Sequence, residues 1–416
     1  MSWSQRIRKA AGQMLGRKFI VRRAAAMAVL LFLAFGFTAC RRDFTVAYLY
    51  VTASSAQGAG FINGYQVDYQ TGALVKTAGS PYAAGAKPVA LVTTNDGLFV
   101  YVVNQDDNTV QEFAVHMGDG SLTSLNTYPT GNMPTSIAID SANKFLYVTF
   151  TYWDGSSGTG GVDIFPINPD NSLGTPLAPV PVGNNPVGIA ASRFFNLVYV
   201  VDSESPNTTS ARGVILGFNQ DPSTGALTPT PATSITGPGG QTVATGFKAG
   251  VRPSAIAIAP VSRFVYVTDR ATNQLYSNII GNSGDLTEIV TSPNPTGNLP
   301  LGITIDPRSL YLYVSNYNSN NVSAFVINPA TGSLTGTLVT AGANTGTGPM
   351  CVAIEPALGL YVYSANFLDN SVSGMKLDAT NGALKTVVNS PFEATGSPTC
   401  AAAVANGSHA TTNLTP

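Results

Sequence analysis

One pattern recurs seven times along this chain of 416 residues, and each copy opens on a proline. Successive opening prolines are 46, 52, 67, 47, 49 and 49 residues apart. They are Pro88, Pro134, Pro186, Pro253, Pro300, Pro349 and Pro398. Self-similarity at such a period indicates a repeat architecture, in which each copy forms one small unit that packs against its neighbours. The chain is therefore expected to fold by joining seven similar units.

Each copy contains short apolar runs separated by turn residues. The first run follows the proline, as at residues 137–139, and a turn that often contains Asp comes next. The second run ends in Tyr-Val-x-Asn or Tyr-Val-x-Asp, and the third carries Val-x-x-Phe, as at residues 110–113. A turn rich in Asn, Pro, Thr and Gly then leads to a Leu. Four short strands in about 50 residues, with tight turns between them, predict one four-stranded blade of a β-propeller.

The two ends of the repeat region complement each other. Residues 44–52 resemble a second strand without a first, and residues 398–405 resemble a first strand without a second. Pairing them completes one blade and closes the ring, which removes the exposed sheet edges that invite aggregation. The sequence thus predicts an all-β, seven-bladed propeller over residues 44–405, with residues 406–416 as a disordered tail. The closing blade is blade 1, and the others follow in chain order.

The first 39 residues form a separate segment. Residues 1–23 hold seven Lys or Arg and no acidic residue, and residues 24–39 are an apolar run that is short for a membrane span. The run ends in Phe37-Thr38-Ala39-Cys40, which resembles a bacterial lipobox, where the Cys is lipidated and becomes the new N-terminus. We expect a signal peptide over 1–39, lipidation of Cys40 and a tether over 40–43, with an uncleaved signal anchor as the alternative. Either predicts export and attachment to the cell envelope, on its periplasmic or outer side.

The charge of the remaining chain limits its partners. Of 21 Lys and Arg, 14 lie beyond residue 23, against 22 Asp and Glu, which gives a net charge of −8. This sign, and the lack of basic clusters beyond Arg41-Arg42, argue against nucleic acid. We find no phosphate loop, nucleophile elbow or haem motif, and the spacing of Asp106-Asp107-Asn108 matches no EF-hand. No cofactor or metal is therefore predicted.

Three insertions decorate one mouth of the expected ring. They are residues 150–161, 202–213 and 229–250, in blades 3 and 4. Antiparallel strands place the loop after a second strand on the same face as the connection into the next blade, so all three lie together. Long loops on a rigid scaffold often bind a ligand, here a small molecule, glycan, peptide or protein, although neutral drift of surface loops is the alternative. The candidate binding residues at this mouth are Tyr152, Trp153, Asp154, Lys87 and Arg252.

The second-strand signature resembles the YVTN-type repeats and the wider family of seven-bladed lactonase propellers. Typical copies read Tyr101-Val102-Val103-Asn104 and Tyr313-Val314-Ser315-Asn316. The resemblance spans about residues 44–405. It implies the fold more strongly than an activity, because the motif is an alternating strand that ends on a turn-capping Asn or Asp.

Family members that act on sugar lactones or muconolactone imply a blade-opening Gly-Pro-Arg-His. Opening a lactone needs a base that activates water and a cation that holds the oxyanion. Here no opening proline is followed by Arg, and the next residue is never His. The two histidines, His116 and His409, fall in an outer turn and in the tail. A non-catalytic binding or scaffold propeller is therefore the leading hypothesis.

A polar set around blades 4 and 5 supports the alternative, a divergent lactone hydrolase similar to 6-phosphogluconolactonase. Its arginines could hold a carboxylate or phosphate, and one of its acids could act as the base. The candidates are Arg252, Arg270, Asp202, Glu204 and Asp269. A solvated salt-bridge cluster at the rim would explain the same residues. A structural surface or adhesion protein is the third possible class.

Two cysteines occupy one register of neighbouring blades. Cys351 and Cys400 each stand two residues after an opening proline, in blades 7 and 1, where the other copies have Ala, Ser or Gly. An exported protein can keep a disulfide there, and two small buried thiols are the alternative.

Overall fold

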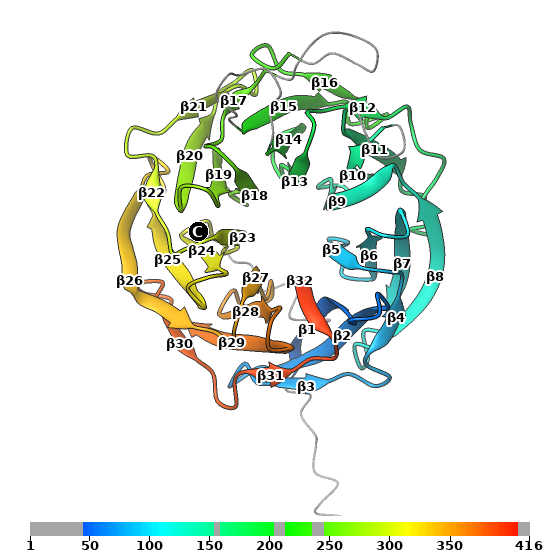
Figure 1. Cartoon of the computed structure of the whole chain (residues 1–416), viewed down its shortest axis with the longest axis vertical. Helices are drawn as coiled ribbons and strands as arrows, with labels where there is room; N and C mark the ends of the chain where they lie inside the picture. Colours follow the sequence, from blue (N-terminus) through cyan, green and yellow to red (C-terminus); the bar gives the residue numbers. More distant parts are fainter. Residues whose placement is uncertain (1–44, 154–158, 204–212, 235–244, 407–416) are drawn as a thin grey trace, which may run out of the picture. The chain divides into compact units, whose positions relative to one another are not determined.

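The computed structural model describes residues 45–153, 159–203, 213–234 and 245–406. They form seven antiparallel sheets arranged in a ring (Figure 1). Among these residues there is no helix that could span a membrane. The seven-bladed, all-β prediction is confirmed.

Each blade is described from its innermost strand outward. Blade 1 contains β32 (Ser397–Ala405), β1 (Thr45–Ser54), β2 (Gly60–Asp68) and β3 (Leu74–Lys76). Blade 2 contains β5 (Pro88–Thr93), β6 (Phe99–Asn104), β7 (Thr109–Val115) and β8 (Leu122–Pro129). Blade 3 contains β9 (Asn132–Ile139), β10 (Phe145–Tyr152), β11 (Gly161–Pro166) and β12 (Val180–Pro181). Blade 4 contains β13 (Pro186–Ala191), β14 (Leu197–Asp202), β15 (Val214–Gln220) and β16 (Leu227–Pro229).

The other three blades repeat this order. Blade 5 contains β18 (Pro253–Ile258), β19 (Phe264–Asp269), β20 (Gln274–Ile280) and β21 (Leu286–Glu288). Blade 6 contains β23 (Pro300–Ile305), β24 (Tyr311–Asn316), β25 (Asn321–Ile327) and β26 (Leu334–Asn344). Blade 7 contains β27 (Pro349–Ile354), β28 (Tyr361–Asn366), β29 (Ser371–Leu377) and β30 (Leu384–Thr386). Four short strands pair with third strands: β4 (Tyr82–Ala84), β17 (Phe247–Lys248), β22 (Asn294–Pro295) and β31 (Phe392–Glu393).

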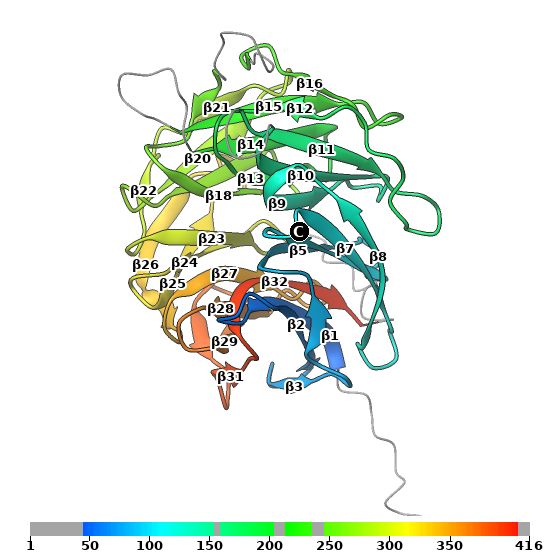
Figure 2. The same cartoon turned by 45° about the vertical axis from the view of Figure 1, so that its right-hand side comes forward.

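The ring closes as the sequence predicts. Strand β1 pairs antiparallel with β32, from Ala47 opposite Ala405 to Ser54 opposite Ser397. The two strands lie side by side in Figure 2. Blade 1 therefore combines strands from both ends of the repeat region, and β1 has a partner on each side.

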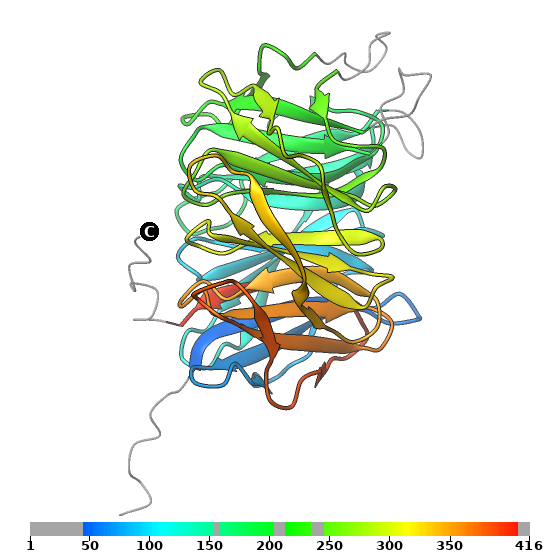
Figure 3. The ribbon, with the colours of Figure 1, turned by 90° about the vertical axis from the view of Figure 1, so that its left-hand side faces the viewer.

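The core lies between neighbouring blades, because each sheet packs against another on both faces (Figure 3). Second strands are consequently buried along most or all of their length, and β24 is buried throughout. One interface joins Tyr50 of blade 1 to Val100 and Phe113 of blade 2, and these side chains are at most 1% exposed. Such continuous burial explains why the second strand carries apolar residues on both faces rather than on alternate positions.

The tyrosine of the signature motif joins each blade to the next. In all seven blades its hydroxyl donates a hydrogen bond, 2.5–3.2 Å long, to a backbone carbonyl in the outer turn of the following blade. The acceptor residue is a glycine in six cases and Asn171 in the seventh, and all seven have positive φ. The donor and acceptor pairs are Tyr50 and Gly120, Tyr101 and Asn171, Tyr147 and Gly225, Tyr199 and Gly284, Tyr266 and Gly332, Tyr313 and Gly382, and Tyr363 and Gly72.

Candidate functional site

Chain direction gives the ring two different mouths. We call the face with the first-to-second-strand turns, such as residues 94–98 and 192–196, the turn mouth. The opposite face is the loop mouth, which carries the second-to-third-strand loops and the connections between blades. The sequence-predicted site lies at the loop mouth.

The acidic candidates at the loop mouth hold the backbone in place. Asp269 is fully buried, and its carboxylate accepts hydrogen bonds from the backbone N–H groups of Val251 (2.9 Å), Arg252 (2.8 Å) and Ala271 (3.1 Å). The hydroxyl of Thr272 donates a fourth bond of 2.6 Å. The carboxylate therefore fixes both its own turn and the connection that enters its blade.

Asp202 does the same one blade earlier. Its fully buried carboxylate accepts from the backbone N–H groups of Asn185 at 2.8 Å and Asn184 at 3.3 Å. These residues precede the opening proline of blade 4. A general base must face the substrate, and these bonds direct the Asp202 carboxylate into the protein instead.

The two basic candidates, Arg252 and Arg270, lie close together because their backbones are hydrogen-bonded. The N–H of Arg270 donates to the carbonyl of Arg252 at 3.0 Å. Arg252 is exposed, Arg270 is half-buried, and neither forms an ion pair with any described residue. The predicted salt-bridge cluster is thus not formed among the described residues, and Glu204 lies outside them.

The remaining loop-mouth candidates belong to separate local structures. The Trp153 ring packs on Phe150, with ring centroids 5.7 Å apart. Lys87 forms an ion pair of 3.6 Å with Asp106, and both side chains are about half exposed. Tyr152 ends β10 and is half-buried. No hydrogen bond or ion pair between described residues joins Lys87 to Tyr152 or Trp153, while Asp154 and Cys40 lie outside the described residues.

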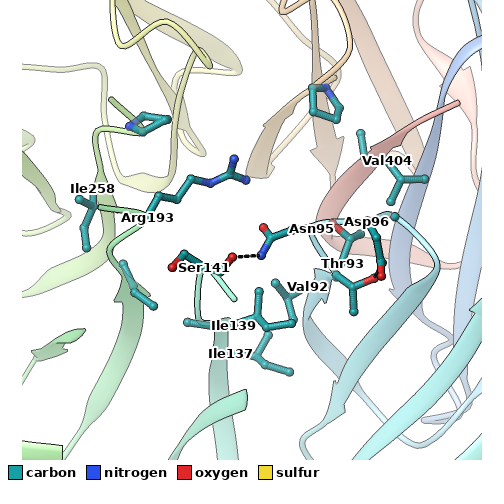
Figure 4. Close-up of a pocket in the computed structure, with 18 of the residues that line it drawn as sticks. Val92, Thr93, Asn95, Asp96, Ile137, Ile139, Ser141, Arg193, Ile258 and Val404 are labelled. Atoms are coloured by element: carbon teal, nitrogen blue, oxygen red, sulfur yellow. Dashed lines mark hydrogen bonds between the residues drawn. The ribbon is translucent and has the colours of Figure 1, made fainter. Parts of the chain in front are cut away.

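A cavity of about 480 Å³ opens at the turn mouth, around the ring axis. Inner strands of six blades or the turns that follow them line it (Figure 4). Its lining is mixed: Val92, Ile137, Ile139, Ile258 and Val404 contribute apolar side chains, and polar groups of the turns stand beside them. Small-molecule sites typically combine apolar side chains with a few polar groups, and both are present here.

Arg193 supplies the positive charge of this cavity. It follows β13 in a turn of ordinary length, and its guanidinium extends across the cavity in Figure 4. The side chain has no hydrogen bond or ion pair to any described residue. The Arg193 residue is exposed to solvent, although the surrounding blades partly desolvate the guanidinium and lower its pKa. An arginine pKa starts so high that the group stays charged.

Polar groups of blade 2 stand at the same cavity. The side-chain amide of Asn95 donates to the carbonyls of Asp140 and Ser141, both at 3.1 Å, which ties the turns of blades 2 and 3 together (Figure 4). One carboxylate oxygen of Asp96 accepts from the N–H of Leu98 at 3.0 Å and from the Thr94 hydroxyl. Asp96 and Arg193 both line the cavity and are not in ion-pair contact.

This cavity was not predicted from the sequence, because the binding site was placed where the loops are longest. The turn that contains Arg193 is no longer than the corresponding turns of the other blades. The available signal was residue type, since the equivalent positions hold Asn95, Ser141, Pro260, Pro307 and Pro356. A single arginine among Asn, Ser and Pro marks a place where one repeat departs from the others.

No described residues form a group of three or more His, Cys, Asp or Glu that could hold a metal ion. His116 lies in the outer turn of blade 2, where its ring hydrogen-bonds the Thr123 hydroxyl at 2.7 Å.

Comparison with known families identifies the same architecture. The family model described as a lactonase, 7-bladed β-propeller, matches residues 48–188 and 213–354, which is more than half of the chain. The chain belongs to the seven-bladed lactonase family. A search of curated proteins finds no matching sequence. The resemblance in the Tyr-Val motif is therefore confirmed at the level of the family.

Several solved structures with this architecture align with most of this chain. A Bacteroides uniformis protein provisionally described as a 6-phosphogluconolactonase is 20% identical, with a TM-score of 0.69, over 87% of this chain and 100% of that one. The periplasmic gluconolactonase of Pseudomonas aeruginosa is 19% identical, with a TM-score of 0.67, over 87% and 100%. A Bacteroides fragilis protein, also provisionally described as a 6-phosphogluconolactonase, is 20% identical, with a TM-score of 0.64, over 88% and 99%. At these identities the likeness shows the fold alone.

Proposed function

We propose that this chain is a ligand-binding propeller of the lactonase family, which holds a small anionic molecule in the turn-mouth cavity without hydrolysing it. The observation that carries the proposal is Arg193, a guanidinium with no partner among the described residues, placed in a cavity with both apolar and polar side chains. A planar guanidinium binds carboxylate or phosphate through paired hydrogen bonds. An unpaired charge that is partly desolvated gains more from such a ligand than one on an open surface.

The cavity suits a ligand with one anionic group and a compact body. Its volume of about 480 Å³ falls in the usual range of small-molecule sites. The gluconolactonase names of the structural relatives make sugar acids the first class to test. Their hydroxyl groups could reach Asp96 and Ser141 while the acid group meets Arg193.

Two observations support binding without turnover. The Arg-His pair that the resemblance implies is absent after every opening proline. Asp202 and Asp269, the acids best placed for chemistry at the loop mouth, hold backbone N–H groups instead. Lactone opening needs a base directed at water, and neither of these carboxylates is so directed.

The test is calorimetric titration of the protein with gluconate and with 6-phosphogluconate. We expect Arg193→Gln to weaken binding by roughly 10- to 100-fold, because a hydrogen bond to a charged group is worth about 1.5–3 kcal/mol. Arg252→Gln is the matched control, since it removes an exposed arginine from the other mouth. Binding that survives in Arg193→Gln and is lost in Arg252→Gln would move the site to the loop mouth.

Lactone hydrolysis is the second candidate, favoured by the family match and by the gluconolactonase names of the relatives. Purified protein would be assayed with glucono-δ-lactone and 6-phosphogluconolactone, beside Arg252→Ala and Asp202→Asn. Turnover that disappears in both variants establishes the hydrolase and rejects the binding proposal. If the protein binds the sugar acid but does not hydrolyse either lactone, the binding proposal is supported.

We also propose that the propeller is exported and anchored to the cell envelope through a lipid on Cys40. The support is the basic segment, the apolar run and the small residues before this Cys. Cys40→Ala is expected to release the protein from the membrane fraction. Membrane attachment that persists in Cys40→Ala would favour the uncleaved anchor.

A further inference from the structure

Two thiols meet at the seam where the ring closes. The Sγ atoms of Cys351 on β27 and Cys400 on β32 are 2.9 Å apart, although no bond joins them in the structure. The two strands belong to blades 7 and 1, and both are innermost. No other described residue is a cysteine.

The close approach follows from the ring geometry. At this register the inner strands of neighbouring blades come so near that small residues are needed. An ideal Cβ on Gly302, the equivalent residue of blade 6, would lie 2.8 Å from the Cα of Cys351. Two cysteines at this level of adjacent blades are therefore held together by the packing of the ring itself.

Their surroundings favour reaction. Both residues are partly exposed, although their thiol groups are packed against each other and against the neighbouring strands. The N–H of Ala401 donates to the Cys351 sulfur at 3.2 Å. The thiol contact lowers the pKa of Cys400, because Cys351 can donate a hydrogen bond to the Cys400 thiolate. A thiolate is the attacking species in disulfide exchange.

We infer that Cys351 and Cys400 form a disulfide that fastens strand β32 to blade 7. In the reaction the Cys400 thiolate attacks a low-molecular-weight or protein disulfide, which releases one thiolate. Cys351 then attacks the mixed disulfide and releases the second. The two cysteines lose two protons and two electrons, and the oxidant is reduced to two thiols.

The bond would act on the seam rather than on the ligand site. Among the described strands of blade 1, β32 alone comes from the C-terminal side of the repeats. If β32 is bonded to β27, it stays in the inner ring even when β1, β2 and β3 separate from it. Strand β1 can then pair with β32 again, and blade 1 can close. A link across 49 residues also reduces the conformational freedom of the unfolded chain. The inference is independent of the proposed function.

Peptide mapping tests the bond directly. The full chain is incubated with glutathione disulfide, alkylated in denaturant and cut with trypsin. Cleavage after Arg308, Lys376 and Lys385 places the two cysteines on separate peptides, 309–376 and 386–416, and Cys40 on a third. We expect 309–376 linked to 386–416, with a mass two hydrogens below the sum. Both peptides alkylated, or either one linked to the Cys40 peptide, overturns the inference.

Thermal unfolding provides the second readout. A reductant should lower the melting temperature of the oxidised protein by on the order of 5 °C. Cys400→Ser should melt at the temperature of the reduced protein and should not respond to reductant. A wild-type melting temperature that ignores reductant would show that the seam carries no disulfide.

Discussion

At the scale of single residues, the motif tyrosine does more than fill the core. Its ring is buried between blades, and its hydroxyl reaches the outer turn of the next blade, as Tyr313 does at Gly382. Phenylalanine would fill nearly the same volume but could not make this bond. Burial raises the pKa of Tyr313, so the hydroxyl keeps its proton and remains a donor. The conserved element within the repeats of this chain is thus a hydrogen bond between blades.

Tyr313→Phe tests this role. The change removes the 3.0 Å bond to the Gly382 carbonyl, which is then left without this donor in a buried interface. We expect the free energy of unfolding to fall by about 1–3 kcal/mol, measured by urea denaturation. Tyr317→Phe is the control, because no described residue hydrogen-bonds its hydroxyl, and it should change stability little. Equal effects of the two substitutions would contradict the interpretation.

Asp163 gives the stability of the fold a pH dependence. Its carboxylate on β11 is 8% exposed and accepts the N–H of Gly131 at 2.7 Å. Burial raises its pKa from 3.8 to about 6, against the opposing effect of this bond. The folded state therefore holds a proton that the unfolded state releases between about pH 4 and pH 6. The stability contributed by that proton is complete below pH 4 and is lost as the pH rises through 6.

Asp163→Asn should remove this pH dependence, because the amide oxygen can still accept the Gly131 N–H. We expect the variant to be more stable than wild type at pH 7 by about 2–3 kcal/mol, and the two to be similar near pH 4. Urea denaturation at several pH values measures the difference. Gln111, whose amide oxygen accepts the Gly85 N–H at 3.1 Å in blade 2, shows that a neutral acceptor suffices. A variant that loses stability equally at every pH would contradict the assigned pKa.

At the scale of strands and turns, much of the structure could be predicted from the sequence. The repeats specify strand order, because apolar runs and turn residues recur at one spacing. The turn-capping role expected for the residue that ends the Tyr-Val motif also holds for Asp269. That residue further fixes the connection ahead of its blade, through Val251 and Arg252. Local patterns could not predict this second contact, since it joins segments that meet only in the folded blade.

The candidate site could not be predicted in the same way. A cavity at the axis exists only after the inner strands have been brought together, and its position depends on side chains from six blades. Arg193 lies in a turn of ordinary length, so neither an insertion nor a motif marks it. The carboxylates of Asp202 and Asp269 were correctly placed at the ends of second strands. Their engagement with backbone N–H groups depends on connections whose path the sequence does not reveal.

At the scale of the whole molecule, closure depends on one strand. Strand β32 covers the inner edge of β1 and stands between β27 and β5 in the inner ring. Further contacts hold the seam, since the Thr52 and Thr399 hydroxyls are 2.8 Å apart and Thr399 donates to the Pro88 carbonyl at 2.6 Å. Without β32, blade 1 would present an unpaired edge to solvent, and the ring would lack one of seven inner strands.

A chain truncated after Glu393 tests this dependence. It lacks β32, so the N–H and C=O groups of β1 that face β32 lose their partners, and Tyr48, Leu49 and Tyr50 lose part of their cover. We expect the truncated protein to associate through the open edge and to lose cooperative unfolding. Light scattering after size-exclusion chromatography and thermal denaturation measure these effects. The control is a chain truncated after Asn406, which keeps every residue of β32 and should remain monodisperse with a wild-type melting temperature. If the shorter chain were also monodisperse and unfolded cooperatively, six complete blades would be shown to close without the seventh.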